Sequence, residues 1–366
     1  MPDLSPRAIA WATTMAGHSG EGVVRAHVEP GVRLESAAPV LREQREEWEA
    51  EHLVAGATRA VGAGERAREE EPDTERTCFE RDRDRIVHST AFRRLAGKTQ
   101  VVVHPSDHQR TRLTHALEVA QVATSIARGV GANVTLAEAI ALGHDCGHGP
   151  GGHASEDAFD AFLLEGYDHG PWGADVVLTS LNLCRQTLDG IRNHSWSRPT
   201  PSTVEGEIVS WADRIAYCAH DLEDAVGAGI VALGDLPEGV VAVAGATRRE
   251  QLSTFVREVI ATTAETGSIG MGAQVAGALA ELRAFNYERI YTRPESVAQS
   301  DAVIAVLRAL VSFYLEHPDR LPERPDDPAQ LTRAAVTYVG GMTDRFAFDT
   351  AVQLLGWDRA RLPRPQ

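Results

Sequence analysis

The run from residue 143 to 156 reads G-H-D-C-G-H-G-P-G-G-H-A-S-E and constrains the fold more than any other segment. Glycine weakens helices and strands, and Pro150 ends any helix arriving from Leu136. The segment therefore predicts a helix that ends near Gly143 and breaks into a loop of histidines and glycines. Such a loop is poor core material, whereas its imidazole and carboxylate groups suit a metal site. The alternative is a solvated helix terminus that happens to be rich in histidine.

Elsewhere the apolar residues recur mostly at helical spacing, which predicts an all-α fold. Strand-like alternation is confined to a short extended piece at 101–103, before a turn at 104–107. Thr111 or Thr114, Ser155 and Thr203 are expected N-caps, because their side chains can accept a hydrogen bond from the first helical turn. Helices are expected over residues 79–95, 111–128, 136–143, 155–164, 178–191 and 204–226. The rest of the chain, including 248–263, 274–290, 302–315 and 331–355, is expected to be mainly helical, interrupted by glycine and proline.

The first part of the chain, residues 1–75, is predicted to be a charged and partly flexible N-terminal extension. A charged, exposed helix is expected at 41–50 and a solvated linker at 65–73, where charged residues are dense. No chemistry is assigned to this extension. Residues 76–366 are expected to form the functional domain.

Composition narrows the setting in which the protein works. The four cysteines are widely spaced without a C-x-x-C pair, which argues against a disulfide framework and for a reducing compartment. No apolar run is judged long enough to cross a bilayer and no signal peptide is recognised, so the expected location is cytoplasmic, with no membrane partner. The formal net charge of −16 argues against general coating of nucleic acid.

Lys98 is the only lysine in a chain whose other basic residues are arginines. One interpretation is that this position needs something that a guanidinium cannot supply. The other is chance within an arginine-biased composition.

Four residues stand out as metal ligands: His115, His144, Asp145 and Asp213. A lone histidine on an apolar helix face, such as His115, is more often a core residue. Asp213 lies among apolar residues, and burying a carboxylate costs several kcal/mol unless a cation or hydrogen bonds compensate it. Together the four give two imidazoles and two carboxylates, a set that favours Mg²⁺, Mn²⁺ or Co²⁺, with Fe, Ni or Zn as alternatives.

The order H…HD…D resembles that of the HD-domain metal-dependent phosphohydrolases. The sequence around these residues makes the resemblance more specific. From Thr77 towards the C-terminus, several runs resemble the deoxyguanosine triphosphate triphosphohydrolase family. They are residues 81–101, T-R-L-T-H-A-L-E-V at 111–119, the run at 143–156, W-A-D-R-I-A-Y at 211–217, F-N-Y-E-R-I-Y at 285–291 and Y-V-G-G-M-T-D-R-F-A at 338–347.

The resemblance implies an HD-domain helical bundle with additional C-terminal helices, and it implies roles by position. His115, His144, Asp145 and Asp213 would hold a divalent metal. The residue acting at the α-phosphorus would be His153, with Glu156 beside it. Substrate-binding roles would fall to residues that contact phosphates (Arg112, His148 and, as a weaker candidate, Arg214), approach the sugar and base (Gln100), or line the sugar pocket (Tyr217 and Asp221).

Helical spacing agrees with parts of this assignment. Arg112 precedes His115 by three residues, which places both on one helix face, and an arginine fork beside a metal suits a triphosphate. The residues Asp213, Tyr217 and Asp221 recur every four residues and share a face. Taken without Asp213, the latter two would read as ordinary helix surface.

The expected activity is metal-dependent hydrolysis of a deoxynucleoside triphosphate to deoxynucleoside and inorganic triphosphate. Attack would be driven by His153 with Glu156, or by a hydroxide held by the metal. The alternatives are another HD-domain phosphohydrolase, such as a nucleotidase or phosphodiesterase, and a catalytically weak nucleotide sensor. The resemblance also implies a homo-oligomer and a deoxynucleotide or single-stranded DNA effector.

Overall fold

The structure is a computed structural model that describes residues 4–20, 22–28, 34–35, 38–101 and 109–363. Its contacts divide the chain into a small unit, residues 1–40, and a large unit, residues 41–366. The predicted extended piece and turn at 101–107 lie almost wholly outside the described residues. The domain boundary near residue 75 stays a prediction drawn from the resemblance.

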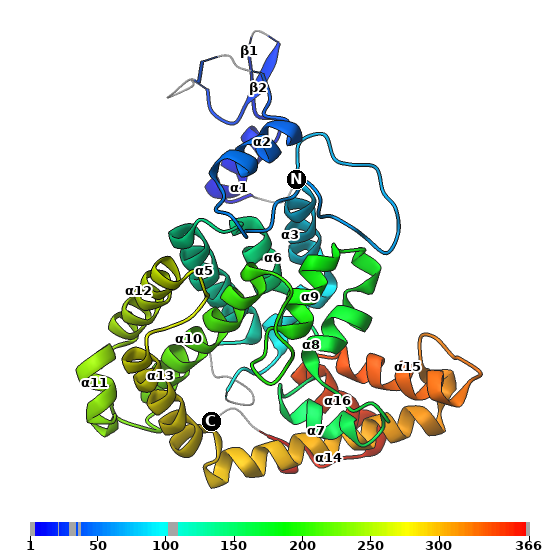
Figure 1. The fold of residues 1–366 in the computed structure, drawn as a ribbon. Helices are drawn as coiled ribbons and strands as arrows, with labels where there is room; N and C mark the ends of the chain where they lie inside the picture. The colour runs from blue at the N-terminus through cyan, green and yellow to red at the C-terminus, as the bar shows by residue number, and fades with distance from the viewer. Residues whose placement is uncertain (1–3, 21, 29–33, 36–37, 102–108, 364–366) are drawn as a thin grey trace. The chain divides into compact units, whose positions relative to one another are not determined.

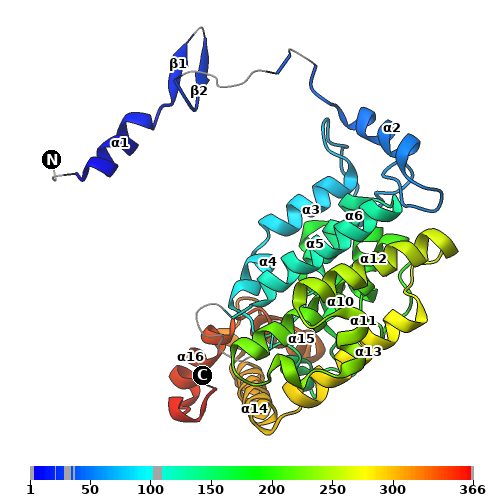
Figure 2. The same cartoon turned by 90° about the vertical axis from the view of Figure 1, so that its left-hand side faces the viewer.

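The small unit consists of a helix and a hairpin (Figures 1 and 2). Helix α1, Pro6–Thr14, begins at Ser5, whose side chain accepts a hydrogen bond from Ala8 N. Strands β1, His18–Gly20, and β2, Val23–Arg25, pair antiparallel. The sequence did not predict this hairpin, because strands this short show no period.

The large unit is built from helices, which confirms the all-α prediction. Its α-helices are α2 Arg42–His52, α3 Cys78–His88, α4 Thr90–Arg94, α5 Arg112–Val130, α6 Val134–Gly143, α7 Ala154–Asp160, α8 His169–Trp172, α9 Arg185–Asn193, α10 Val204–Gly227, α11 Glu238–Ala244, α12 Arg248–Thr266, α13 Ala273–Asn286, α14 Pro294–Glu316, α15 Pro328–Gly340 and α16 Asp344–Leu355. Single turns join them: the 3-10 turns η1 Leu95–Gly97, η3 Thr179–Leu181, η4 Leu233–Asp235, η6 Pro318–Arg320 and η7 Arg359–Arg361, and the π turns η2 Gly173–Val177 and η5 Tyr287–Tyr291.

Two hydrophobic cores hold these helices together. The first forms where α5, α6 and α10 pack on one another, and it includes Ile126, Ile140 and Ile215, all fully buried. The second forms where α14 packs on α7, α15 and α16, seen as the orange and red helices beside α7 in Figure 1. Burial of this apolar surface is the main stabilising term of the fold.

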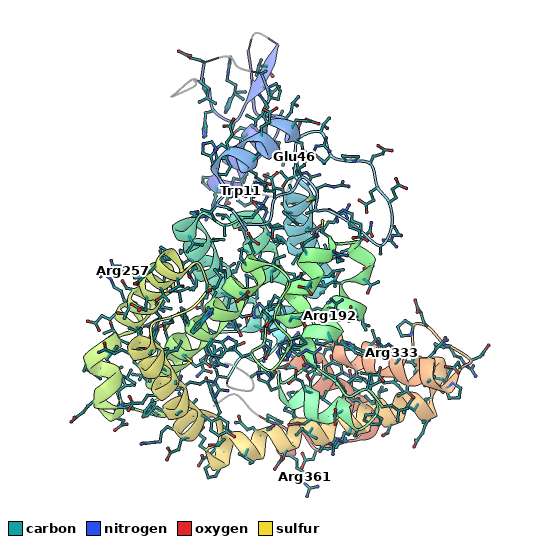
Figure 3. All side chains as sticks on the ribbon, viewed as in Figure 1. Trp11, Glu46, Arg192, Arg257, Arg333 and Arg361 are labelled. Atoms are coloured by element: carbon teal, nitrogen blue, oxygen red, sulfur yellow. The ribbon has the colours of Figure 1, made fainter. Side chains whose placement is uncertain are left out.

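The glycine loop, residues 143–153, crosses from one core to the other. Leu142, just before the loop, and Cys146, within it, belong to the first core. Ala154 and Ala158, just after the loop, belong to the second. Figure 3 shows side chains filling the space around these helices. Among them, Arg333 of α15 reaches the segment after α7, where its guanidinium lies 4.8 Å from the centre of the Trp172 ring.

Three helix predictions need correction. The helix expected over 79–95 is interrupted at Ser89, whose side chain caps a new helix by accepting from Phe92 N. Ser155 is not an N-cap: α7 begins after His153, and the Ser155 hydroxyl instead bonds to the glycine loop. The helix expected over 178–191 is short turns followed by α9. Thr203 is confirmed as a cap, accepting from Gly206 N.

The expectation that no apolar run reaches membrane-spanning length is also corrected. Among the described helices, α14 alone is long and apolar enough to cross a membrane by length and composition. This criterion is weak for a single helix, because core helices pass the same test. Val303, Val306 and Leu310 of α14 lie in the second core.

Lys98 is buried, with 3% of its surface exposed. Its ammonium donates hydrogen bonds to the carbonyls of His148 and Gly340, which belong to the glycine loop and to the end of α15. Burial lowers the pKa of this amine to about 8, although Asp344 nearby favours its charged form. The position is therefore occupied by a compact cation that joins two backbone segments.

This burial predicts a pH dependence of stability. Between pH 8, where folded Lys98 releases its proton, and the ordinary value of 10.5, only the unfolded chain holds that proton. Stability is therefore expected to rise with pH in this window, by about 3 kcal/mol. Urea titrations give the free energy of unfolding of wild type and of Lys98→Met at pH 7 and at pH 10.5. The difference between the two proteins should change by this amount between the two pH values, and a constant difference contradicts the prediction.

Candidate metal centre and active site

Ten of the twelve predicted site residues line one pocket of about 440 Å³ in the large unit. The other two, His144 and Glu156, do not line the pocket. Each contacts a residue that does: His144 contacts Asp145, and Glu156 contacts His153. The pocket-lining ten are Gln100, Arg112, His115, Asp145, His148, His153, Asp213, Arg214, Tyr217 and Asp221. The fold therefore brings most of the residues named from the sequence into one pocket, and their roles remain proposals.

The four predicted metal ligands converge from three places. His115 comes from α5, His144 and Asp145 follow the end of α6, and Asp213 comes from α10. His115 Nε2 lies 3.0 Å from Asp213 Oδ1, and His144 Nε2 lies 3.5 Å from Asp145 Oδ1 and 3.7 Å from Asp213 Oδ1. His115, His144 and Asp145 form one group of donors that could hold a metal ion, and His144 and Asp213 form a second such group with His194.

The hydrogen bonds of His144 fit this use. His144 Nδ1 lies 2.6 Å from the carbonyl oxygen of Ala141, and a carbonyl only accepts, so the proton resides on Nδ1. The buried Nε2 then carries a lone pair and has no hydrogen-bond partner among the described residues. A carbonyl that fixes the tautomer of a ligating histidine is the usual arrangement in metal sites. The orphaned nitrogen therefore supports the predicted donor set.

Electrostatics keep the donors in the forms that bind a cation. Burial alone would raise the pKa of Asp145, but Arg112, His144 and His148 hold it well below its usual range. Burial would likewise raise the pKa of Asp213, which the hydrogen bond from His115 lowers instead. Burial lowers the pKa of His144, so its ring is neutral. Anionic carboxylates and a neutral imidazole are the ligating forms.

Arg112 stands beside these donors. Its Nη1 donates to Asp145 Oδ2 at 2.6 Å, and its Nε is buried without a partner among the described residues. Gly152 lies directly against the guanidinium: a Cβ there would sit 2.4 Å from Nη2, and its φ of +64° also favours glycine. Glycine at 152 therefore lets the loop approach this arginine.

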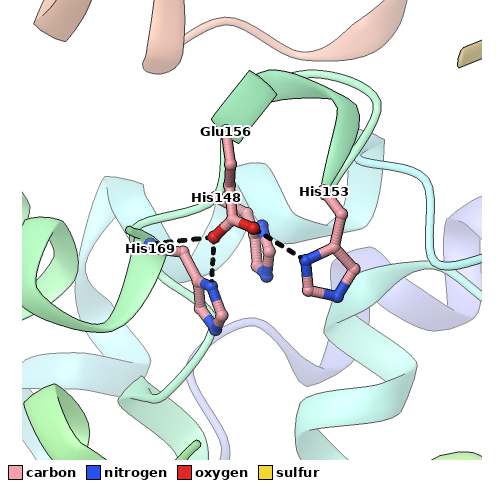
Figure 4. A group of neighbouring side chains, drawn as sticks. All are labelled: His148, His153, Glu156 and His169. Carbon is pink, nitrogen blue, oxygen red and sulfur yellow. Dashed lines mark hydrogen bonds and ion pairs between the residues drawn. The ribbon is translucent and has the colours of Figure 1, made fainter. Parts of the chain in front are cut away.

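Beyond the glycines, Glu156 joins two histidines (Figure 4). His153 Nδ1 lies 3.0 Å from Glu156 Oε2, and His169 Nδ1 lies 2.6 Å from Oε1. Burial alone would raise the pKa of Glu156, but these two hydrogen bonds lower it strongly. An ionised carboxylate only accepts, so both Nδ1 atoms carry protons, and the Nε2 of His153 is the ring nitrogen that does not bond to Glu156. The His153 side chain is 73% exposed.

His169, which sequence reasoning missed, is a buried cation. His194 Nδ1 lies 2.8 Å from the carbonyl of Ile191, and burial lowers the pKa of His194 to about 3, so its Nε2 is an acceptor. His169 Nε2 lies 3.0 Å from that acceptor and must donate to it. With both nitrogens donating, His169 is an imidazolium. Burial opposes this charge, but Glu156 raises the pKa of His169 above its usual value.

His148 lies between the two halves of the site. Its ring stacks on that of His169, with centres 3.7 Å apart. Both ring nitrogens are buried without a hydrogen-bond partner among the described residues, although Nε2 lies 3.3 Å from Asp145 Oδ1. Burial holds its pKa well below the usual value, so the ring is neutral. A second group of donors, His148, His153, Glu156 and His169, thus lies beside the predicted metal ligands.

The pocket lining also includes tyrosines and a buried carboxylate. Asp221 Oδ2 accepts from the hydroxyl of Tyr291 at 2.5 Å, and its Oδ1 accepts from Arg110. Burial raises the pKa of Asp221 even though Arg110 favours its charged form. The hydroxyl of Tyr217 accepts from Arg283 Nε at 2.9 Å. Sequence reasoning placed Tyr291 in a family-like run without giving it a role, and it missed Arg110 and Arg283.

Arg214 and Gln100 complete the lining. The Arg214 guanidinium lies 3.5 Å from the centre of the Trp196 ring, an attractive cation–π contact. Its buried Nε has no hydrogen-bond partner among the described residues, and the same holds for Gln100 Oε1. Both residues line the pocket.

Two family models and several related proteins match this chain. The HD domain family model matches residues 112–218, and the phosphohydrolase-associated domain model matches residues 269–353. Deoxyguanosinetriphosphate triphosphohydrolase-like proteins align over most of the chain. The protein of Caldanaerobacter subterraneus subsp. tengcongensis is 39% identical over 89% of this chain and 97% of its own. Those of Clostridium perfringens and Clostridium tetani are 37% and 35% identical over 77% and 84% of this chain, and over 87% and 93% of theirs.

The helical fold and the clustered histidines and aspartates, together with these matches, define an HD-domain phosphohydrolase. A phosphohydrolase-associated domain follows the HD domain and contributes the helices of the second core from α14 to α16. The chain belongs to the deoxyguanosinetriphosphate triphosphohydrolase-like family.

Proposed function

We propose that this protein hydrolyses deoxynucleoside triphosphates to deoxynucleoside and inorganic triphosphate. The observation that carries the proposal is a single pocket lined by two kinds of residues. The predicted metal donors, Arg112 and His153 suit a triphosphate, and Tyr217 and Asp221 suit a sugar. The relatives' names support a substrate of this kind.

Metal binding is proposed for His115, His144, Asp145 and Asp213, with Mg²⁺, Mn²⁺ or Co²⁺ favoured and Fe, Ni or Zn as alternatives. An ion bound there would neutralise phosphate charge and polarise the α-phosphorus. Homo-oligomerisation, regulation by a deoxynucleotide or by single-stranded DNA, and a cytoplasmic location remain expectations from the resemblance and composition.

Side chains of this protein would stabilise charge and transfer protons during the reaction. Arg112, Arg214 and the cationic His169 would stabilise negative charge on the phosphates. Water attacks the α-phosphorus, the bond to the 5′ oxygen of the nucleoside breaks, and that oxygen takes up a proton. Glu156 orients His153 so that its Nε2 faces away from the carboxylate and can exchange a proton with water or the leaving oxygen.

Product analysis tests the proposal. Purified protein is incubated with dGTP, dATP, dCTP or TTP and with Mg²⁺, Mn²⁺ or Co²⁺, and the products are separated by HPLC. Deoxynucleoside and triphosphate are the expected products. Release of a monophosphate, or of phosphate alone, would identify a different HD-domain phosphohydrolase. Tight binding without turnover would identify a nucleotide sensor.

Asp221 is expected to distinguish the 3′-hydroxyl of the sugar. Because a hydrogen bond to a charged group contributes about 1.5–3 kcal/mol, Asp221→Asn should lower kcat/KM for a deoxynucleoside triphosphate about 10- to 100-fold. A 2′,3′-dideoxy analogue lacks the hydroxyl, so the same substitution should change its kcat/KM little. Steady-state kinetics measure the ratio of kcat/KM for the two substrates in each protein. Asp224→Asn, which alters another carboxylate of the Arg110 cluster, should keep the wild-type ratio. Equal losses on both substrates contradict the assignment.

A further inference from the structure

Two buried side chains tie the glycine loop to the helix ends, Gly340 of α15 and Asp344 of α16, that flank the turn at residues 341–343. The first is Lys98, which donates to the His148 carbonyl and to the Gly340 carbonyl, the latter at 3.0 Å. Gly340 ends α15, where the helix dipole places partial negative charge, so a cation is favoured there. Lys98 therefore joins the loop to a helix end without needing a carboxylate partner.

The second tie is Asp344, the first residue of α16, which is 4% exposed. Its Oδ1 accepts from Gly151 N at 2.8 Å, and its Oδ2 accepts from Thr99 N at 2.9 Å and from the Thr99 hydroxyl. One carboxylate thus holds both the glycine loop and the segment that precedes Gln100. The two bonds from Thr99 are buried and the bond from Gly151 is partly buried, so losing one leaves a polar group at least partly shielded from water and without its partner.

Close packing accompanies these bonds. A Cβ at Gly97 would lie 2.7 Å from the Thr343 side chain, and one at Gly151 would lie 2.5 Å from Val303 of α14. Both segments therefore lie directly against helices of the phosphohydrolase-associated domain. None of Lys98, Gly340 and Asp344 lines the pocket.

We propose that Lys98 and Asp344 are positioning residues that fasten the glycine loop, and with it His153, to these ends of α15 and α16. By this means the phosphohydrolase-associated domain fixes the catalytic half of the site while the HD domain fixes the metal half. A lysine suits the position because its compact ammonium reaches two carbonyls, whereas a guanidinium is a larger planar fork. The catalytic consequence rests on the proposed function; the fastening itself does not.

The single lysine supplies a direct test. An amine-reactive N-hydroxysuccinimide ester can label only Lys98 and the α-amino group, and peptide mass spectrometry separates the two. Folded wild type should protect Lys98. In Asp344→Asn, where an amide can no longer accept from both Gly151 and Thr99, Lys98 should label at least about 10-fold faster. The kcat for the deoxynucleotide should fall about 10-fold or more in both Asp344→Asn and Lys98→Met, with KM changed less than about threefold.

Asp82→Asn is the matched control. Asp82 of α3 is fully buried and also accepts three hydrogen bonds, from Arg66 Nη1 at 2.6 Å, Cys184 N at 2.8 Å and the Thr187 hydroxyl at 2.7 Å. None of these groups belongs to the glycine loop. This variant should lose thermal stability, yet keep Lys98 labelling within about twofold and kcat within about threefold of wild type.

Two results would overturn the proposal: wild-type labelling of Lys98 in Asp344→Asn, or equal effects on labelling and kcat in both aspartate variants. If Asp344→Asn does not fold, Thr99→Val and Thr187→Val each remove one hydroxyl donor from the respective carboxylate, and the labelling comparison is made on that pair. Labelling needs no substrate, so it decides the fastening even if no deoxynucleotide is hydrolysed. Absence of hydrolysis would count against the proposed function alone.

Discussion

Replacement of Asp213 by asparagine is expected to abolish metal binding and hydrolysis together. Asp213 supplies a carboxylate 3.0 Å from His115 Nε2 and 3.7 Å from His144 Nε2, and its lowered pKa keeps it anionic. An amide is a neutral, weaker ligand, so the donor set loses a charge and keeps only a weaker metal–oxygen bond at this position. We expect metal content after dialysis to fall below about a tenth of the wild-type value, and hydrolysis to fall by about 10³-fold or more.

Elemental analysis and product release, measured on the same preparation, check this prediction. Glu223→Gln provides the control, because Glu223 lies on the same helix, α10, and pairs at the surface with Arg248. It should change neither quantity. Circular dichroism establishes that both variants fold. Retention of metal and activity by Asp213→Asn would remove Asp213 from the ligand set.

His153→Ala should lower hydrolysis without lowering metal content, whereas Asp213→Asn should lower both. His153 lies beyond the glycines and contacts Glu156 rather than the metal donors, so the metal should be retained. Loss of a positioned acid or base lowers kcat by about 10²- to 10⁴-fold. The KM should change only a few-fold, because Arg112 and Arg214 remain. Glu156→Gln should give an intermediate loss, since a glutamine still packs there but orients the ring less strongly.

Steady-state kinetics with metal analysis measure the effect of His153→Ala, and His52→Ala, an exposed histidine on α2, is the control. Full activity of His153→Ala would leave attack to a water activated at the metal, which is the alternative that the sequence left open. A loss of metal content instead would assign His153 to the ligands.

The sequence was sufficient for the parts of the site that depend on helical spacing. Asp213, Tyr217 and Asp221 recur every four residues on α10 and do line one pocket. Arg112 and His115 share a face of α5 for the same reason. Glu156 was expected within reach of His153, and the two are hydrogen-bonded. Local periodicity determines all three relations, so no knowledge of the tertiary fold was needed.

The residues that were missed depend on tertiary contacts. His169 lies in a segment assigned as a loop, and only packing brings it to Glu156, thirteen residues earlier in the chain. Its charge depends further on the tautomer of His194, fixed by the Ile191 carbonyl. The segment 65–73, expected to be a solvated linker, is mostly exposed, but the side chain of Arg66 is only 6% exposed and pairs with Asp82. Charge density alone could not reveal these partners.

Because the metal donors extend from the first core and His153 from the edge of the second, the two halves of the site need not fail together on heating. Cooperative units of one protein commonly open with different free energies. Loosening of α14–α16 would misplace His153 while the proposed ligands His115, His144, Asp145 and Asp213 kept their places. If these residues hold the proposed ion, a stored or heat-stressed preparation would be fully metallated and inactive, and its metal content would be a poor measure of the active fraction.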